Sequence, residues 1–352
     1  MATTTTNSVL NKERKTKDSL KGVKLMKARK VIAALGAVAS LVAATAFGTT
    51  SAEAASKITV AGVYGMTYDP FWISLGCGAK AQAKAMGVNW KDYSTKSGDA
   101  ADYSNSFTSA TLSKPNGILV NPANPNQFVT QYKQQMSKGV PVVTINGSTP
   151  AAQFKVVGTD VANTAFLTEL GKVVATGTKG TIGVVNGVPG LAPVDNRLNP
   201  VVDAIKRANP GLKELEAQYT YFDSNKAQQA ASALMLANSD LKVIVAADGP
   251  DGEGVAAAVK AAGKAGQIVV ISLDATPPLV AALKDGTISA LVAQAPARIG
   301  ALQVKTLVDY IKSGKKGAVK ASSDFVGVPQ KLLLASNVDN KANADWVYKA
   351  TC

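Results

Sequence analysis

Asp274 and Gln294 each end an apolar run that is typical of a buried strand. The runs cover residues 268–273 and 288–293, with a helical pattern over 278–284 between them. Ligands of parallel α/β sheets bind beyond the carboxyl ends of the strands, so both side chains are expected to face one crevice. A carboxylate accepts two hydroxyl donors and an amide both donates and accepts, which suits a neutral ligand rich in hydroxyls. Ordinary capping of the strand ends explains this stretch alone equally well.

Two adjacent aromatic residues, Phe71 and Trp72, follow the first predicted strand and stand directly after Asp69 and Pro70. An aspartate followed by a proline in the first turn is a sound helix start that needs no ligand. Two neighbouring rings of one helix cannot both face the core, however. At least one is expected to project toward the crevice, where its face could stack on the apolar side of a sugar ring.

Four further residues occupy comparable places at the ends of predicted elements. Asn146 and Asp248 each end a strand, Phe222 follows one, and Arg197 lies near the start of a helix. The arginine has five fixed donors that would complement hydroxyl and ring oxygens if it pointed inward, although a lone arginine is ordinarily a surface residue. Phe222 offers a second ring face and Asp248 another acceptor.

The composition excludes much of the usual catalytic equipment. The 352 residues include no histidine and two cysteines, so no Ser-His-Asp triad, Cys-His dyad, histidine metal site or structural zinc site can exist. Nucleotide binding is not indicated, because the loop 248–254 does not fit G-x-G-x-x-G and no P-loop occurs. The same loop lacks the spacing of a calcium-binding EF-hand. Asp248 and Asp274 as a glycosidase pair lack a recognisable acid in an apolar setting. We expect no enzyme activity, no cofactor and no metal.

The chain is basic, with 38 Lys and Arg against 24 Asp and Glu, a net charge of +14. Part of this excess lies in the first 54 residues, and the remainder is spread as single lysines without an interleaved aromatic or arginine stripe. This pattern indicates a solvated surface and not a nucleic-acid partner.

The N-terminal region has the three parts of a secretory signal peptide. A basic segment over 26–30 precedes an apolar segment over 31–47, and Ala52-Glu53-Ala54 forms a small-residue cleavage site. The pattern is complete from Met26, so residues 1–25 are interpreted as a spurious extension. A membrane anchor is the alternative, but the apolar segment is short and no lipid-anchor cysteine follows it. The mature chain is expected to start near Ala55 and to be periplasmic or secreted, without a stable membrane anchor.

Cys77 and Cys352 are expected to pair, because disulfides persist outside the cytoplasm. The bridge would tie the last residue to the first predicted helix. Closing so long a loop stabilises by about 4 to 5 kcal/mol in the chain-entropy model. Two separate thiols are the alternative.

Strand and helix patterns alternate along the rest of the chain, which predicts an α/β fold with two doubly wound parallel sheets. The expected strands are 58–63, 88–93, 117–120, 140–145, 156–158, 181–185, 214–221, 243–246, 268–273 and 288–293. The expected helices are 70–86, 101–112, 125–137, 162–176, 195–208, 224–237, 252–262 and 278–284.

Several motifs over about residues 57–336 resemble those of the periplasmic sugar-binding proteins of ABC importers, in particular the ribose-binding type. They are Asp69-Pro-Phe-Trp72, Val120-Asn-Pro122, Pro141-Val-Val-Thr144, Ser272-Leu-Asp-Ala-Thr-Pro277 and Ala293-Gln-Ala-Pro-Ala-Arg-Ile-Gly300. The resemblance implies a ligand set of Asp69, Phe71, Trp72, Asn146, Arg197, Phe222, Asp248, Asp274 and Gln294. Four positions depart from the ribose type, because Asp69 and Asp248 replace asparagines and Asn146-Gly147 replaces an Asp-Arg pair. A larger sugar or a polyol therefore stands beside ribose as the expected ligand.

The resemblance also implies an architecture of two lobes joined by a three-stranded hinge, with the ligand in the cleft between them. The expected first lobe is 57–160 plus 295–323, the second is 161–294 plus 324–336, and 337–352 forms a tail, with crossings near Asp160, near Gln294 and near Asp324. The implied function is delivery of a sugar or polyol to an ABC importer permease by a monomeric binding protein. The alternatives are a sensory binding protein for a chemoreceptor or kinase and, further off, a carbohydrate-acting enzyme. A repressor would carry a helix-turn-helix where this chain has a signal peptide.

Overall fold

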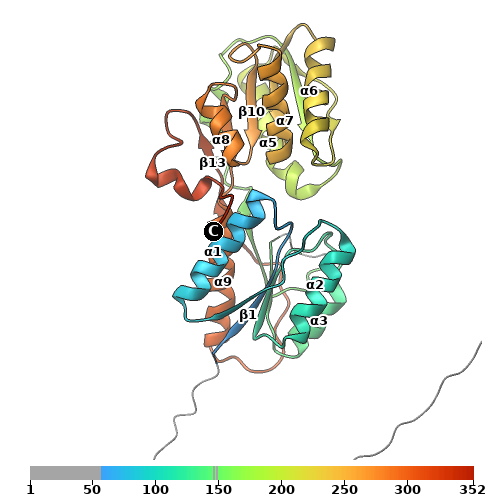
Figure 1. Ribbon diagram of the computed structural model, residues 1–352, viewed down its shortest axis with the longest axis vertical. Helices are drawn as coiled ribbons and strands as arrows, with labels where there is room; N and C mark the ends of the chain where they lie inside the picture. The colour runs from blue at the N-terminus through green and yellow to red at the C-terminus, as the bar shows by residue number, and fades with distance from the viewer. Residues whose placement is uncertain (1–56, 146, 148–149) are drawn as a thin grey trace, which may run out of the picture. The chain divides into compact units, whose positions relative to one another are not determined.

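The computed structural model describes residues 57–145, 147 and 150–352, so the predicted signal peptide and Asn146 lie outside the described residues. The described chain builds two sheets, and we call each sheet with its helices a lobe (Figure 1). The predicted α/β class with two parallel-sheet domains is confirmed.

The first lobe contains a parallel sheet that, within the described residues, has the strand order β12-β5-β4-β3-β1-β2. Its strands are β1 (Thr59–Val63), β2 (Asn89–Asp92), β3 (Gly117–Val120), β4 (Val142–Thr144), β5 (Lys155–Asp160) and β12 (Phe325–Pro329). Helices α1 (Pro70–Ala85) and α9 (Pro296–Lys312) lie on one face, and α2 (Ala100–Leu112) and α3 (Val129–Ser137) lie on the other (Figure 1). Because both faces are covered, central strands of the sheet are apolar, as in β3, where Ile118, Leu119 and Val120 are fully buried.

The second lobe has the strand order β13-β11-β10-β9-β6-β7, with β8 beside β6. Its strands are β6 (Gly180–Asn186), β7 (Leu212–Glu214), β8 (Gln218–Tyr219), β9 (Leu241–Ala246), β10 (Val269–Leu273), β11 (Ala290–Ala293) and β13 (Lys331–Leu333). Its helices are α4 (Leu167–Gly171), α5 (Ala192–Ala208), α6 (Ser224–Ala237), α7 (Gly249–Ala261) and α8 (Pro277–Lys284). The edge strand β13 runs antiparallel to β11, unlike the wholly parallel sheet that was expected.

Three backbone segments of the described chain connect the sheets. The first segment follows β5, the second follows β11, and the third is Gln330, between β12 and β13. The predicted third crossing near Asp324 is wrong, because β12 pairs with β5 along its whole length, from Phe325 opposite Val156 to Pro329 opposite Asp160. Residues 325–329 therefore belong to the first sheet, and the chain reverses direction at Gln330.

Two predicted elements differ most from the structure. The expected helix 162–176 is reduced to α4, because the Asp160 carboxylate accepts hydrogen bonds from the backbone N–H groups of Ala162 and Asn163 and holds a turn there. The expected strand 214–221 is divided into β7 and β8. The other predicted helices start close to the expected positions, except that α3 starts at Val129 and not at residue 125, and α9 was not among the expected helices. Helices α1, α5, α7, α8 and α9 each have a proline in the first turn.

Glycines allow α1 and α9 to pack closely. A Cβ atom at Gly300 would lie 2.0 Å from the Leu75 carbonyl oxygen, and one at Gly78 would lie 1.8 Å from the Ala297 carbonyl oxygen. The contact brings the middle of α1, at Leu75 and Gly78, against the first turns of α9, at Ala297 and Gly300.

The tail after β13 forms a 3-10 helix, η1 (Lys341–Trp346), and ends at Cys352. The predicted disulfide is present, joining Cys77 of α1 to Cys352 with their Cα atoms 5.3 Å apart.

Candidate functional site

Asp274 is the centre of a hydrogen-bond network at the carboxyl end of β10. Its backbone has φ +74°, a left-handed conformation that aspartate tolerates better than most residues, and its side chain is buried. Oδ1 accepts from Arg197 Nη1 at 2.9 Å, from Gln294 Nε2 at 2.8 Å and from Tyr348 Oη at 2.8 Å. The sequence predicted three of these four residues, and the structure brings them into direct contact.

The network reaches the first lobe through Gln294. Its Oε1 accepts a hydrogen bond from Thr159 Oγ1, near the end of β5. On the other side, Arg197 Nε donates to the Pro193 carbonyl oxygen at 3.2 Å within α5. Arg197 is 6% exposed, so the arginine is a buried partner of Asp274 and not a surface residue. Its desolvation is offset by the ion pair and by this second hydrogen bond.

The second oxygen of Asp274 makes no hydrogen bond among the residues that the structure describes, and neither does Arg197 Nη2. One carboxylate oxygen is therefore saturated, while the other is available as an acceptor. The adjacent guanidinium nitrogen is available as a donor. This arrangement can bind a hydroxyl group, which donates and accepts at once.

Asp69 caps α1 in the first lobe, where its Oδ1 accepts from the Phe71 backbone N–H at 2.7 Å. Burial raises the pKa of Asp69 to about 6, and the negative charges of Asp274 and Glu253 in the second lobe add to this rise, while the hydrogen bond from Phe71 lowers it. Asp69 at the start of α1 therefore lies close enough to Asp274 for the charge of Asp274 to raise the pKa of Asp69.

The aromatic rings of Phe71 and Trp72 pack against different parts of the protein. Phe71 meets Trp72 edge-on with ring centroids 4.9 Å apart, and it meets Tyr348 at 5.9 Å. Trp72 packs on the backbone at Gly65, where a Cβ atom would lie 2.6 Å from the indole. Both rings are half-buried. Phe71 therefore extends toward the Asp274 network, and Trp72 lies against the loop after β1.

A second pair of carboxylates begins α7. Asp248 Oδ1 accepts from the Asp251 backbone N–H at 2.9 Å, and Asp251 Oδ1 accepts from Thr220 Oγ1. Within the described chain, the Oδ2 atoms of both aspartates are buried without a partner. Burial raises the pKa of Asp248 well above its usual range and the pKa of Asp251 to about 6. Such oxygens need a proton or a ligand hydroxyl.

Phe222 lies apart from the Asp274 network. Its backbone has φ +60°, it is 40% exposed, and its ring covers Gly187, where a Cβ atom would lie 2.4 Å away. The structure gives no direct contact between Phe222 and the other predicted site residues that it describes. The prediction for Asn146 concerns a residue outside the described ranges.

Comparison with known proteins places this geometry in a family. Residues 60–316 match the family described as the periplasmic binding protein domain. The chain belongs to the periplasmic binding protein family. The resemblance that the motifs indicated is thus confirmed, and the family is one of binding proteins.

Individual relatives and solved structures are also similar to this periplasmic binding protein. It is 30% identical to the D-allose-binding periplasmic protein of Escherichia coli K12 over 290 residues, which cover 78% of this chain and 91% of the relative. It is 27% identical to the ribose import binding protein of Salmonella typhimurium, covering 82% of this chain and 96% of the relative. An ABC transporter solute-binding protein from Agrobacterium vitis, solved with α-D-tagatopyranose, matches with a TM-score of 0.72 and 27% identity over 83% of this chain and 100% of that chain.

Three site residues of this periplasmic binding protein escaped the sequence analysis: Thr159, Asp251 and Tyr348. Thr159 and Asp251 carry no motif of their own. Tyr348 had an indirect signal, because a bridge between Cys77 and Cys352 brings residues shortly before Cys352 to the start of α1.

No cluster of three or more cysteine, aspartate or glutamate side chains arranged for a metal ion occurs in the described ranges. In the same ranges, no helix has both the length and the apolar character that a membrane span requires.

Proposed function

We propose that this protein is an extracytoplasmic solute-binding protein that captures a sugar or polyol between its two lobes and delivers it to an ABC importer. The observation that carries the proposal is that the two carboxylate oxygens of Asp274 differ in their hydrogen bonds. One oxygen accepts hydrogen bonds from α5, from the segment after β11 and from the tail. Within the described residues, the other oxygen and Arg197 Nη2 make no hydrogen bond.

The acceptor-rich lining supports a ligand with many hydroxyl groups. Asp69 and Asp248 stand where the ribose type has asparagines, so these positions lose donors and keep acceptors. Asp248 Oδ2 is buried without a partner in the described part of the chain, so it needs either a proton or a donor, and a sugar hydroxyl can supply the donor. The relatives named for D-allose and ribose, and the neighbour solved with α-D-tagatopyranose, support a monosaccharide of five or six carbons.

The ligand is bound and released without chemical change. The protein acts as a monomer outside the cytoplasm after removal of the signal peptide, and its partner is the permease of an importer. Nothing favours the sensory alternative, because the relatives cited above are described as binding or import proteins.

A thermal-shift screen of the mature chain from Ala55 tests the proposal. The panel contains D-allose, D-ribose, D-tagatose, a polyol series and amino acids. Because binding to the native state stabilises by mass action, a sugar or polyol present at 100 times its Kd is expected to add about 2.7 kcal/mol and to raise Tm by several degrees. A rise caused only by amino acids or anions, or a sugar recovered chemically altered, would contradict the proposal.

A further inference from the structure

We propose that residues 334–352 form a strap across the sugar site, and that Tyr348 in this strap selects between sugars by fixing the Asp274 carboxylate. The inference rests on the proposed function, since it assigns a residue to that same site. The family match covers residues 60–316 and ends before this segment begins.

The strap is ordered by its own contacts where it leaves β13. The Asn337 side chain accepts from the Leu334 backbone N–H at 3.0 Å, and Asn343 Nδ2 donates to the Asn337 carbonyl oxygen at 2.8 Å. Trp346 Nε1 donates to the Pro329 carbonyl oxygen at 3.1 Å, at the crossing between the sheets. The segment is therefore fixed against the hinge before it reaches the site.

The cations of Arg298 and Lys331 lie over the Trp346 ring, 5.0 and 4.6 Å from its centroid. Arg298 comes from α9 of the first lobe and Lys331 from β13 of the second. The indole is thus held by both lobes, and this holds the following residues in register.

Tyr348 then enters the site. Its hydroxyl donates to Asp274 Oδ1 at 2.8 Å, its backbone N–H donates to the Ala275 carbonyl oxygen at 2.9 Å, and its ring contacts Phe71. The ring is buried, and burial raises the pKa of Tyr348 well above its usual range. The phenol therefore stays protonated and remains a donor to Asp274.

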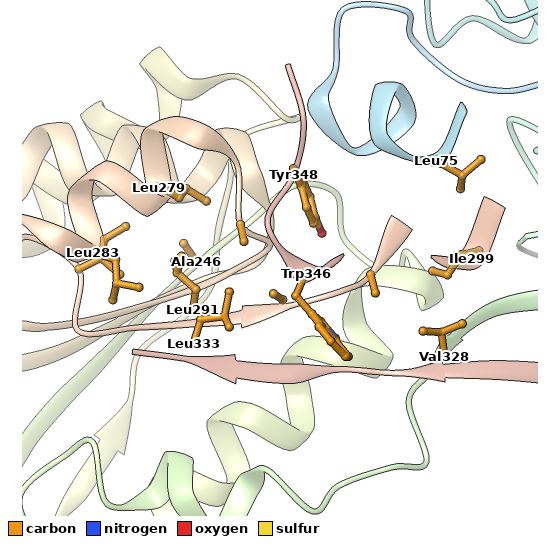
Figure 2. Packing of buried hydrophobic residues seen from close by; sticks show 14 of the residues in the cluster. Leu75, Ala246, Leu279, Leu283, Leu291, Ile299, Val328, Leu333, Trp346 and Tyr348 are labelled. Carbon is orange, nitrogen blue, oxygen red and sulfur yellow. The ribbon is translucent and has the colours of Figure 1, made fainter. Parts of the chain in front are cut away.

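The end of the strap is fastened to the first lobe. The Lys349 backbone N–H donates to Ser74 Oγ at 2.6 Å, and Cys352 is bonded to Cys77. The strap thus adds a fourth covalent connection to the three backbone crossings of the described chain. Figure 2 shows Tyr348 and Trp346 within the buried cluster that joins Leu279, Leu291 and Leu333 of the second lobe to Leu75 and Ile299 of the first.

This geometry makes Tyr348 a positioning residue for the ligand. With the phenol in place, Oδ1 of Asp274 is occupied and a sugar hydroxyl can bind only at Oδ2. Without it, Oδ1 gains a vacant acceptor position and the carboxylate can rotate. Sugars that differ in the orientation of one hydroxyl would then be distinguished less well.

The test compares Tyr348→Phe with Tyr64→Phe in the mature protein. Tyr64 is a matched control, because its buried hydroxyl also makes a 2.9 Å hydrogen bond, to Gln303 Oε1 in the core of the first lobe. Calorimetric titrations use D-allose and D-ribose. Tyr348→Phe is expected to weaken the better-binding sugar about tenfold and to reduce the affinity ratio between the two sugars. Tyr64→Phe should leave the ratio unchanged even if Tm falls. Equal ratios in Tyr348→Phe and wild type would overturn the inference.

The covalent anchor is tested with Cys77→Ser combined with Cys352→Ser. The pair of changes is expected to weaken sugar binding about 3- to 10-fold alone and to have little further effect in Tyr348→Phe, because both act through the same hydroxyl. Additive losses would contradict this coupling.

Small-angle scattering of the ligand-free forms separates this inference from the proposed function. Without the bridge, the radius of gyration should increase as the lobes open further. If wild type binds no sugar or polyol of the thermal-shift panel, the proposed function fails. The scattering result still decides on the strap, because identical dimensions with and without the bridge would reject it.

Discussion

At the scale of single residues, Asp274 has two roles that different substitutions can separate. It balances the charge of buried Arg197, and in the proposed function it offers Oδ2 to the ligand. Asp274→Ala would leave the guanidinium buried without a counter-charge, at a cost of about 3 to 5 kcal/mol of unfolding free energy. The alanine variant is thus a poor probe of binding alone, although the sequence by itself makes it the obvious choice.

Asp274→Asn keeps an oxygen acceptor for Arg197 and removes the negative charge. We expect it to remain folded and to weaken sugar binding at least tenfold, as measured by titration calorimetry, because hydrogen bonds to a charged group contribute about 1.5 to 3 kcal/mol. Asp309→Asn, in an exposed i,i+4 ion pair with Lys305, is the control and should change neither affinity nor stability appreciably. Wild-type affinity in Asp274→Asn would remove this carboxylate from the site.

The raised pKa of Asp69 predicts a dependence of stability on pH. The value of about 6 in the folded state exceeds the ordinary value of 3.8, so the folded state binds the proton more tightly. The resulting stabilisation is present below pH 3.8 and is lost as pH rises through about 6. Asp69→Asn keeps a helix cap and never ionises. It should therefore raise Tm relative to wild type at pH 7 and give little difference at pH 4. The same difference at both pH values would contradict the assigned burial.

Sugar binding should show the opposite trend with pH. A ligand that donates hydroxyl groups to the carboxylates of Asp69 and Asp251 favours their ionised forms, and each has a pKa of about 6 without ligand. Affinity is therefore expected to rise between pH 5 and pH 7, with protons released on binding. Calorimetry at pH 6 in two buffers of different ionisation enthalpy measures that release. Binding that takes up protons would show that the carboxylates act as neutral donors.

At the scale of elements, the close contact between α1 and α9 fixes how the two helices cross. Gly300→Ala would place a methyl group 2.0 Å from the Leu75 carbonyl oxygen, which is backbone and cannot rotate away. We expect a loss of about 1 to 3 kcal/mol in unfolding free energy, measured by denaturant titration.

Gly76→Ala, inside α1, is the matched control for this contact. A Cβ atom there meets nothing within 4 Å, so this variant should be unchanged or more stable by up to about 1 kcal/mol. Equal effects of the two substitutions would mean that the helix crossing is not as tight as described.

The same scale shows what the sequence could and could not predict. Apolar runs and helix-start prolines predicted most of the strands and helices. Polar residues at strand ends predicted Asp274, Gln294 and Asp248 as site residues, because parallel strands present their carboxyl ends at one edge of the sheet. The turn held by Asp160 broke a predicted helix, since a side-chain cap competes with a helical pattern without changing it. The third crossing was misplaced because the local sequence pattern does not show which strand a given strand pairs with.

The contacts within the site were less predictable than its members. The sequence placed Arg197 and Asp274 near one crevice but did not show that they neutralise each other. Tyr348 lies 74 residues from Asp274 in the chain, and its role depends on the course of the strap. Such pairings arise from tertiary packing.

At the scale of the whole molecule, the described chain has two lobes, three backbone crossings and a disulfide-closed strap. The Asp274 network uses residues from both lobes and from the strap, so a ligand that completes it favours the arrangement in which the lobes are together. The account therefore depends on one claim: a single hydroxyl-rich ligand is held by both lobes around Asp274.

A crystal structure of the mature protein with the sugar that most raises Tm tests this claim most directly. We expect an unaltered sugar with one hydroxyl within hydrogen-bond distance of Asp274 Oδ2 and with contacts to Asp69 or Phe71 from the first lobe and Arg197 from the second. A sugar bound to one lobe alone, away from Asp274, would contradict the account.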